Sequence, residues 1–449
     1  MINPSSNRRS LVLLELNEIN FEIVKQYVDA DATLFPALRR LMAGARVRTE
    51  AEQKYDEIEP WIQWVSIHSG LSYEQHGIFR LGDIAGSAVP QFYEELERRG
   101  IKVGCISPMN AENRLSAPSY FLPDPWTSTP TDGSWWSRQL HAAIAQAVND
   151  NAQAKVSFKS KLALALGLLR FARVRNYATY LKLLANARSA PWGKALFLDL
   201  FLHDLHMTLL RAKRPGFSSL FLNAGAHIQH HYFLSAQPVK HGNERRNPAW
   251  YVSGDADPVK DMLAFYDRIV ADYLESNDFE VIVATGLSQQ PYERLKYYYR
   301  LKDHAAFLRL VGVDCVAVQP RMTRDFLVDF GDESAMRRAI AQMRSITIEQ
   351  DGAPLFAEIE ERGNSAFVTL TYPDEITPQT RIVVDGRSLP LAEHVAFVAL
   401  KNGMHRSEGY AFFTAGVAPF APADRQHVKE LNRSVMSYFG ALATDNAGH

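Results

Sequence analysis

The hydrophobic residues of the chain fall into short continuous runs, separated by longer stretches in which they recur every three or four positions. Runs of strand length occur at residues 11–16, 103–106, 219–222, 281–284 and 315–318. Stretches with helical periodicity include residues 21–41, 89–99 and 259–274. Short apolar strands that alternate with amphipathic helices are typical of a parallel sheet covered on both faces. The pattern therefore predicts an α/β fold with a central, mostly parallel sheet flanked by helices.

Two segments depart from this alternation and predict how the chain is divided. Residues 134–215 are almost wholly helical in pattern, which predicts a helical insertion. Residues 332–400 combine one helical stretch with alternating strands and Pro/Gly turns, which predicts a small α+β appendage. The core is then built from residues 1–133, 216–331 and 401–449. A chain of 449 residues is long enough for one large domain with such additions.

The predicted helical insertion carries an unusual charge pattern. Residues 159–188 are rich in Leu, Ala, Lys and Arg, and the positive charge falls on the expected outer face. The simplest interpretation is a solvated helical cap. A lid over a site and a contact with a membrane surface are the two alternatives.

The overall composition excludes several classes of protein. The 49 basic and 50 acidic side chains give a net charge of −1, so we expect no nucleic-acid partner. Two cysteines, Cys105 and Cys315, cannot form a disulfide framework or a four-thiolate zinc site, which favours a reducing compartment. The longest apolar stretch, near residues 162–169, is shorter than the roughly 18 to 20 residues that cross a bilayer. We therefore expect a cytoplasmic protein with no transmembrane segment, and the sequence does not indicate its oligomeric state.

Polar clusters follow three of the predicted strands. They lie at residues 15–18, 223–231 and 285–290. Ligands of parallel sheets bind at the carboxyl ends of the strands, so these clusters predict a shared site at one edge of the sheet.

These clusters and two further motifs resemble the alkaline phosphatase superfamily, in particular its type I phosphodiesterase/nucleotide pyrophosphatase branch. The most specific match is EPWIQWVSIHSG at residues 59–70, followed by EQHGI at residues 74–78. Ser66 takes the place of the family's nucleophile in this match, and Gly403-Met-His405 matches its Gly-x-His motif. The resemblance implies an alkaline phosphatase-like core. It also implies a metal-dependent hydrolase or transferase that acts on a phosphate ester, phosphodiester or pyrophosphate.

The departures from the family concern its metal ligands. Amides replace carboxylates at Asn17 and Asn223, and the family's Asp-His pair is missing at residues 286–287. A centre of two divalent ions needs anionic ligands, so the resemblance implies at most one zinc or manganese ion, with no metal as the alternative. The candidate ligands are Glu15, Asn17, Glu18, Asn223, His227, His231 and His405.

Some of these candidates also have a meaning that does not depend on the family. His227 and His231 lie four residues apart, the spacing of zinc-binding helices, and with His405 they could form a recast three-histidine site. A helix that begins at Ala224 would place His227 and His230 in its first turns, so capping or hydrogen bonding to the loop is the competing interpretation of these two histidines. The candidates for binding a small anionic phosphorylated or glycan-type substrate are Gln63, His68, Asn110, Gln289, Asn402 and Arg406. A non-hydrolytic member of the fold, which binds such a ligand or a protein partner, is the alternative function.

Overall fold

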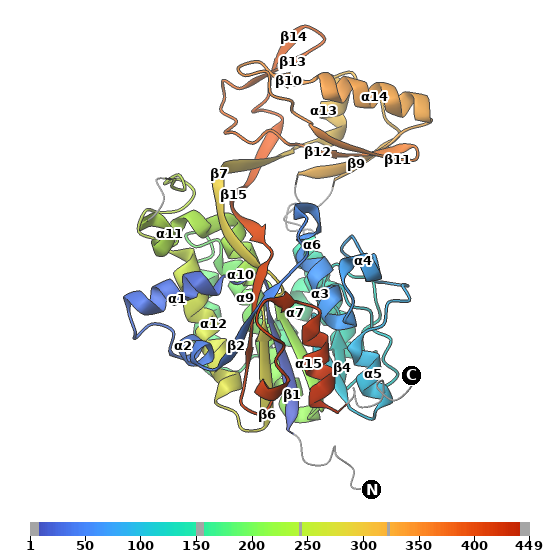
Figure 1. Cartoon of the computed structure of the whole chain (residues 1–449). Coiled ribbons are helices and arrows are strands. Elements are labelled where there is room, and N and C mark those ends of the chain that lie inside the picture. Colours follow the sequence, from blue (N-terminus) through green and yellow to red (C-terminus); the bar gives the residue numbers. More distant parts are fainter. Residues whose placement is uncertain (1–8, 150–156, 242–244, 321–323, 441–449) are drawn as a thin grey trace. The chain divides into compact units, whose positions relative to one another are not determined.

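The computed structural model describes residues 9–149, 157–241, 245–320 and 324–440. The chain divides into two compact units, whose helices and strands are labelled in Figure 1. Among the described residues, the larger unit comprises residues 9–149, 157–241, 245–291 and 403–440, and the second unit comprises residues 292–320 and 324–402. Each unit has a hydrophobic core of its own.

An eight-stranded sheet forms the centre of the larger unit, in the order β17-β2-β16-β6-β1-β5-β3-β4. Its strands are β1 (Ser10–Leu16), β2 (Ala45–Glu50), β3 (Val103–Ile106), β4 (Tyr120–Leu122), β5 (Phe217–Leu222), β6 (Phe279–Ala284), β16 (Glu408–Phe413) and β17 (Gln426–His427). Strand β1 runs parallel to β5 and β6, and β3 runs parallel to β4 and β5. Strand β16 is antiparallel to β6 and β2. The predicted α/β class with a mostly parallel sheet is confirmed.

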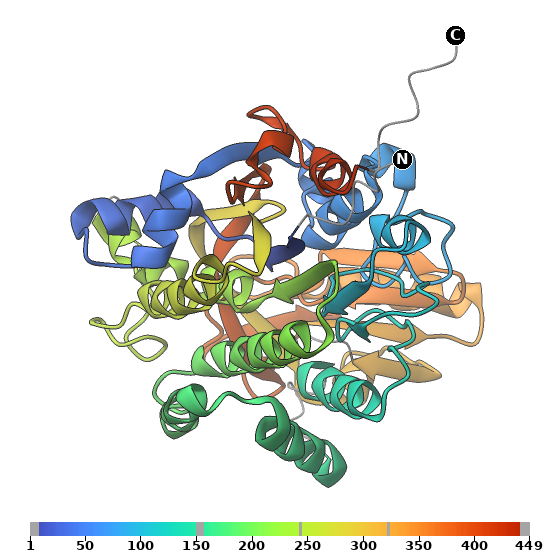
Figure 2. The ribbon, with the colours of Figure 1, turned by 90° about the horizontal axis from the view of Figure 1, so that it is seen from below.

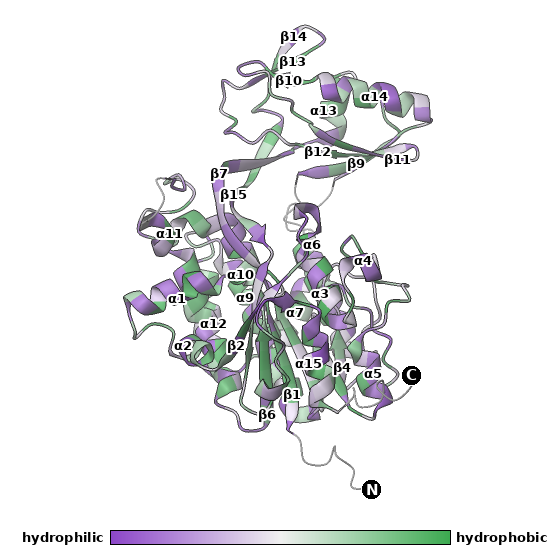
Figure 3. Cartoon of the chain, in the orientation of Figure 1, coloured by the Kyte–Doolittle hydropathy of each residue, from purple (hydrophilic) through white to green (hydrophobic). Residues whose placement is uncertain are grey.

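Helices cover both faces of this sheet (Figure 2), which is why nearly every residue of its inner strands is buried. One face packs against α3 (Pro60–Ser69), α5 (Phe92–Arg98) and α15 (Glu430–Tyr438). A second group of mutually packed helices comprises α2 (Pro36–Ala43), α9 (Gly193–Lys213), α10 (Ala224–Tyr232) and α12 (Pro258–Leu274). Helix α1 (Phe21–Ala30) follows β1, and the short α4 (Tyr73–His76) follows α3. Figure 3 shows that the central strands are the most hydrophobic part of this unit.

The predicted helical insertion belongs to the larger unit. It contains α6 (Trp135–Asn149), α7 (Phe158–Phe171), α8 (Tyr177–Ala185) and α9. Helix α9 packs on β5 and also contacts α7 and α8. It therefore lies between these two helices and the sheet (Figure 2).

The second unit begins at Tyr292, earlier than the predicted boundary near residue 332. It holds α13 (His304–Leu310), α14 (Glu333–Ser345) and an antiparallel sheet of β8 (Ala317–Pro320), β9 (Asp325–Asp329), β11 (Glu358–Arg362) and β12 (Ser365–Thr369). A smaller sheet contains β10 (Thr347–Ile348), β13 (Arg381–Val384) and β14 (Arg387–Pro390). The apolar run at residues 315–318 thus enters this unit through β8, which pairs with β9 and not with the central sheet. Strands β7 (Ser288–Leu301) and β15 (Val395–Arg406) pair with each other and carry the chain between the two units.

Within the described residues, no helix combines the length and the apolar character that a bilayer span requires. The cytoplasmic location expected from the sequence stays a prediction.

Candidate metal centre

The turn after β1 places two polar side chains at the carboxyl edge of the sheet. The backbone nitrogen of Asn17 donates to the carbonyl of Leu222 over 3.1 Å, and the backbone nitrogen of Glu18 donates to the carbonyl of Thr285 over 3.0 Å. The turn is therefore fastened to the ends of both neighbouring strands. Glu18 has a φ of 63°, in the left-handed region that costs a residue with a Cβ about 1 kcal/mol or more. The fastened turn holds this conformation and directs the carboxylate over the edge of the sheet.

Three side chains from distant parts of the chain meet at this carboxylate. Oε2 of Glu18 lies 3.1 Å from Nε2 of His230 and 3.2 Å from Nε2 of His405. The two histidine nitrogens lie 3.2 Å from each other. Zinc binds such ligands at about 2.0 to 2.1 Å, and two ligands of a tetrahedral ion are then about 3.3 Å apart. The three donor atoms are therefore spaced as a single divalent ion requires, and they form a metal-competent group.

In both histidines, the nitrogen on the far side of the ring from Glu18, Nδ1, lies near an acceptor oxygen. Nδ1 of His230 lies 3.3 Å from the carbonyl oxygen of Gly403, and Nδ1 of His405 lies 3.4 Å from Oε2 of Glu59. Carbonyl and carboxylate oxygens only accept, so a proton on each Nδ1 would leave the Nε2 of a neutral ring with a lone pair directed at Glu18. Metal-binding histidines are commonly oriented in this way by an acceptor behind the ring.

The charge of Glu18 suits the same role. Burial alone raises the pKa of a carboxyl group, but the adjacent His405 and His230 bring the pKa of Glu18 below its ordinary value. The group is therefore an ionised carboxylate beside two imidazoles. Three acceptor atoms at such short distances repel one another unless a cation or a shared proton lies among them. A metal ion therefore fits the residues that are present.

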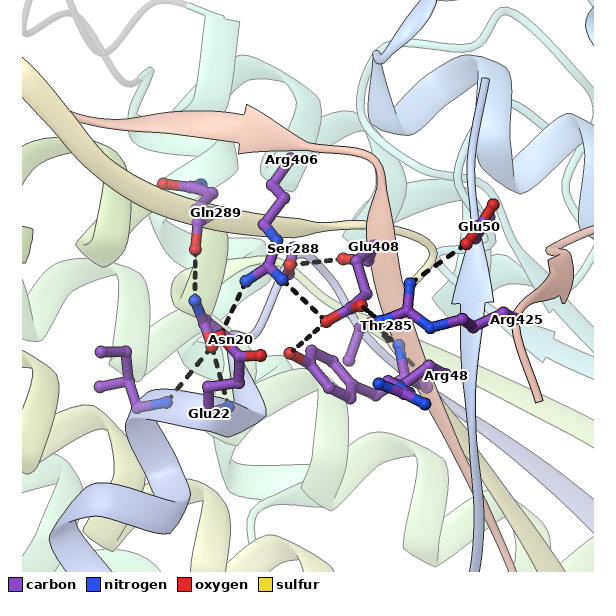
Figure 4. Close-up of polar contacts among 12 residues, drawn as sticks. Asn20, Glu22, Arg48, Glu50, Thr285, Ser288, Gln289, Arg406, Glu408 and Arg425 are labelled. Atoms are coloured by element: carbon purple, nitrogen blue, oxygen red, sulfur yellow. Dashed lines mark hydrogen bonds and ion pairs between the residues drawn. The ribbon is translucent and has the colours of Figure 1, made fainter. Parts of the chain in front are cut away.

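Further hydrogen bonds hold Glu18 in place. The side-chain nitrogen of Gln289 donates to Oε2 of Glu18 over 2.5 Å and to the carbonyl of Ala226 over 3.0 Å. The side-chain nitrogen of Gln229 donates to the backbone carbonyl of Glu18 over 2.8 Å. Asn20 in turn donates to the backbone carbonyl of Gln289 over 2.7 Å (Figure 4). Gln289, predicted to bind substrate, thus lies at the group and supports its carboxylate.

Asn17 and Asn223, two of the predicted ligands, are not arranged as ligands. Nε1 of Trp64 donates to Oδ1 of Asn17 over 2.8 Å. The side-chain nitrogen of Asn17 then donates to Oε1 of Glu18 over 3.0 Å and to Oδ1 of Asn223 over 2.8 Å. The side-chain N–H groups of Asn17 thus lie between the oxygens of Glu18 and Asn223 and bond to both. These two oxygens are therefore not arranged to share a second cation.

His227 and His231, also predicted ligands, do not join the group. Their rings contact each other, with centroids 4.7 Å apart, and His227 is exposed. Helix α10 buries Ile228 and Tyr232 on its inner side, which turns His227 outward. His230, which was not among the predicted ligands, reaches Glu18 instead. The sequence signal that could have pointed to His230 was the spacing of the apolar residues of α10, because these residues define the inner side of the helix.

Ser66, the predicted nucleophile, is fully buried inside α3 and bonded elsewhere. Its Oγ lies 3.1 Å from Nε2 of His76, and Nδ1 of His76 accepts from the backbone nitrogen of Ile78 over 3.0 Å. Nε2 of His76 therefore carries the ring proton and donates it to Ser66, so that this ring nitrogen has no lone pair to act as a base. Burial also lowers the pKa of His76 to about 4, which keeps the ring neutral.

Helix α3 approaches the metal-competent group through its first residues. Glu59, its N-cap, contacts His405, whereas Ser66 lies seven residues later, about 10 Å farther along the helix axis. The nucleophilic role of Ser66 stays a prediction, and these contacts do not favour it.

Glu15 and His68 form a separate buried pair. Oε1 of Glu15 lies 3.6 Å from Nε2 of His68, and both side chains are fully buried. Burial raises the pKa of Glu15 even though His68 acts in the opposite direction. Neither residue belongs to the group of Glu18, His230 and His405, so their predicted roles as ligand and substrate contact have no support here.

Other predicted substrate contacts serve the fold. Oδ1 of Asn110 accepts from the nitrogen of Gly82 over 2.8 Å, and its amide donates to the carbonyl of Trp61 over 3.1 Å. The amide of Gln63 donates to the carbonyl of Glu57 over 2.9 Å. Both side chains are fully buried, and Asn402 is a buried residue of the second unit.

Arg406 is neutralised by its neighbours (Figure 4). Its guanidinium lies 2.8 Å from Oε2 of Glu22 and 3.0 Å from Oε1 of Glu408. Glu408 also pairs with Arg425 over 3.0 Å. An anionic substrate would have to compete with two carboxylates for Arg406, which weakens its predicted role in substrate binding.

Comparison with known proteins places these residues in a wider setting. No family model and no curated protein matches the chain. Similar solved structures include phosphonoacetate hydrolase from Sinorhizobium meliloti 1021 in complex with phosphonoacetate, which is 13% identical over 96% of both chains with a TM-score of 0.42. Alkaline phosphatase from the Antarctic bacterium TAB5 is 9% identical over 97% of this chain and 99% of its own, with a TM-score of 0.41. Murine ectonucleotide pyrophosphatase/phosphodiesterase 5 is 10% identical over 98% of both chains, with a TM-score of 0.39.

These three proteins belong to the superfamily that the sequence motifs resemble. At such low identities and TM-scores, however, the likeness says nothing about the chemistry of this chain.

Proposed function

We propose that the chain is a metal-dependent hydrolase or transferase that acts on a phosphate ester, phosphodiester or pyrophosphate, with one divalent ion held by Glu18, His230 and His405. The supporting observation is the spacing of their three donor atoms, together with the acceptors behind both imidazole rings. A set of two imidazoles and one carboxylate suits zinc, and manganese is the alternative.

The residues around the ion would have distinct roles. A bound divalent ion supplies Lewis-acid polarisation of a phosphoryl oxygen. Glu18 offsets part of the charge of the ion, and Gln289 keeps the carboxylate oriented. Glu59 holds His405 in the tautomer that binds metal. The three-histidine site of His227, His231 and His405 is replaced in this proposal by a site with His230.

A second function is a binding protein that holds an anionic or glycan-type ligand without turnover. The amide of Asn17 favours it, because its N–H groups bridge Glu18 and Asn223 where a second ion would need ligands. The neutralised Arg406 favours it as well, since a strong phosphate clamp is then missing at this position.

Metal analysis of the full chain, purified without chelators and then incubated with zinc or manganese, tests the site. We expect about one equivalent of bound metal in the wild-type chain, and fewer than about 0.2 equivalents in His230→Ala and His405→Ala. His227→Ala is the matched control, because it removes an exposed histidine of the same helix, and it should retain the metal. Wild-type protein that takes up no metal, or a His230→Ala variant that binds it normally, would contradict the proposed site.

Turnover separates the two functions. The metal-loaded chain is assayed with 4-nitrophenyl phosphate and bis(4-nitrophenyl) phosphate. Hydrolysis that is lost in His405→Ala and kept in His227→Ala supports the enzyme. Stoichiometric metal without hydrolysis of either ester argues for the binding protein.

A further inference from the structure

Helices α7 and α8 present large apolar side chains to solvent. Phe158 is 81% exposed, Leu169 is 75% exposed and Leu181 is 68% exposed. The other large apolar residues exposed in this segment are Leu162, Leu166, Val174, Tyr177 and Leu184. A cluster of exposed apolar side chains marks an interaction surface, whereas single exposed apolar residues are common on any protein. These eight residues are called the outer apolar face below.

The spacing of these residues places them on one side of each helix. On α7 they recur after four, four and three residues, and on α8 after four and three residues. The inner sides of both helices are already packed, since a Cβ on Gly167 would meet Leu140 and Phe201, and the ring of Tyr180 contacts Phe197. The outer apolar face is therefore additional to the surface that the fold itself buries.

The same segment is strongly basic. Residues 157–198 contain eight basic and no acidic side chains, which leaves the rest of the chain nine charges negative. The basic residues are Lys159, Lys161, Arg170, Arg173, Arg175, Lys182, Arg188 and Lys194. Arg173 and Arg175 pair with Asp272, Arg175 from an exposed position, and the other six basic residues are also exposed. Exposed cations thus flank the residues of the outer apolar face along the chain.

The connection between the two helices is anchored to the fold. Arg173 pairs with Asp204 of α9 and with Asp272 of α12, each over 2.6 Å. The hydroxyl of Tyr180 donates to Asp204 over 3.0 Å. Such ties argue against a lid that moves over the metal centre, and they present the face in a fixed orientation.

We propose that the outer apolar face docks the protein on the surface of an anionic membrane. Apolar side chains that enter the interface, with lysines and arginines beside them, are the features of helices that lie in the plane of an anionic bilayer. A second copy of the chain fits less well, because pairing two such faces would bring like charges together. This inference does not depend on the proposed function of the metal centre.

Co-sedimentation of the full chain with lipid vesicles tests the proposal. Vesicles of phosphatidylcholine with about 30% phosphatidylserine are compared with vesicles of phosphatidylcholine alone, at low and at physiological salt. We expect binding to the anionic vesicles to be at least roughly tenfold stronger, and to weaken as salt rises.

Two sets of exposed substitutions identify the surface. The triple variant Phe158→Ser, Leu169→Ser, Leu181→Ser and the triple variant Lys159→Glu, Lys161→Glu, Lys182→Glu should each weaken binding by roughly tenfold or more. Val316→Ser is the control, because it removes an apolar side chain that is 73% exposed in the second unit. Circular dichroism confirms that each variant is folded.

Three results would overturn the proposal. They are an absence of binding to anionic vesicles, binding that neither triple variant changes, and a concentration-dependent dimer in sedimentation velocity that the serine variant makes monomeric. The last result would assign the face to a second copy of the chain.

Discussion

The indole nitrogen of Trp64 donates to the side-chain oxygen of Asn17 over 2.8 Å, and this single bond determines what Asn17 can do. An indole N–H only donates, so the oxygen of the amide must face Trp64 and its nitrogen must face Glu18 and Asn223. The side-chain nitrogen of Asn17 therefore donates to both of these neighbours. The proposed site consequently holds one ion and not two.

Asn17→Asp should make the chain depend on added metal. The substitution replaces the bridging donor by a carboxylate next to Glu18 and Asn223, so three oxygens face one another. In chelator we expect a loss of about 3 kcal/mol in the free energy of unfolding, since a buried charge is left unpaired. Excess manganese or zinc should restore more stability to this variant than to the wild type, as thermal unfolding would show.

Asn17→Ala is the control for this experiment, because it removes the same hydrogen bonds without adding charge. It should gain no more from metal than the wild-type chain does. Equal stability of Asn17→Asp and wild type in chelator would contradict the bridging role of the amide.

Ser66→Ala should leave turnover within about twofold of wild type. The hydroxyl is buried and hydrogen-bonded to His76, so its loss should lower the free energy of unfolding by about 1 kcal/mol. Ser69→Ala is a matched control, because Ser69 lies in the same helix and donates to the carbonyl of Val65. A large fall in kcat for Ser66→Ala at unchanged Tm would restore Ser66 as the nucleophile.

Gly403→Ala should disturb the metal centre through packing alone. A Cβ at this position would lie 2.2 Å from Oε1 of Gln289 and 2.7 Å from the carbonyl oxygen of Gln229. Because the backbone of α10 cannot yield easily, we expect a loss of about 1 to 3 kcal/mol in stability. Gln289 and His230 would shift when the added Cβ displaces their neighbours, so metal affinity should fall roughly tenfold. Competition with a chelating dye measures this affinity.

Gly254→Ala is the matched control for this clash. A Cβ there meets no atom within 4 Å, so stability and metal affinity should be unchanged. A Gly403→Ala variant with normal affinity would show that the contact between Gly403 and α10 is irrelevant to the site.

The stability of the larger unit should fall in mild acid because of His206. Burial lowers the pKa of His206 to about 3, and the ring contacts the hydroxyls of Tyr273 and Ser218, each at 2.7 Å. Below the ordinary histidine pKa of about 6.5, the unfolded state binds a proton that the folded state does not. The stabilisation is complete above that pH and is lost as the pH falls, by about 1.4 kcal/mol per pH unit.

Urea unfolding followed by tryptophan fluorescence measures this effect, because all seven tryptophans lie in the larger unit. His206→Gln should be less stable than wild type at pH 7 but should lose about 2 kcal/mol less between pH 6.5 and pH 5. Parallel pH profiles for the two proteins would show that His206 does not carry the dependence.

Much of the fold could be predicted from hydrophobic patterns, because buried strands are apolar along their whole length. The run at residues 103–106 coincides with β3, and the run at residues 281–284 falls within β6. The stretch with helical periodicity at residues 21–41 forms two helices, α1 and α2, which are separated by five residues. The run at residues 315–318 gave no sign that it would leave the central sheet, since local hydrophobicity does not specify the partner strand.

The site was predicted less completely, because it depends on side-chain direction. Glu18 and His405 were expected as ligands, and the structure brings them together. His230 was missed because His227 and His231 have the more familiar spacing, although the inner side of α10 turns His227 away. Ser66 was favoured by its motif, whereas its burial and its bond to His76 depend on packing that the sequence does not reveal.

Two residues of the proposed site lie on the strands that connect the two units, β7 and β15. Strand β7 starts at Ser288, beside Gln289, and ends in the second unit, and β15 starts there and ends with His405 and Arg406. Gln289 and His405 are therefore carried by the two paired strands at which the chain leaves and re-enters the larger unit.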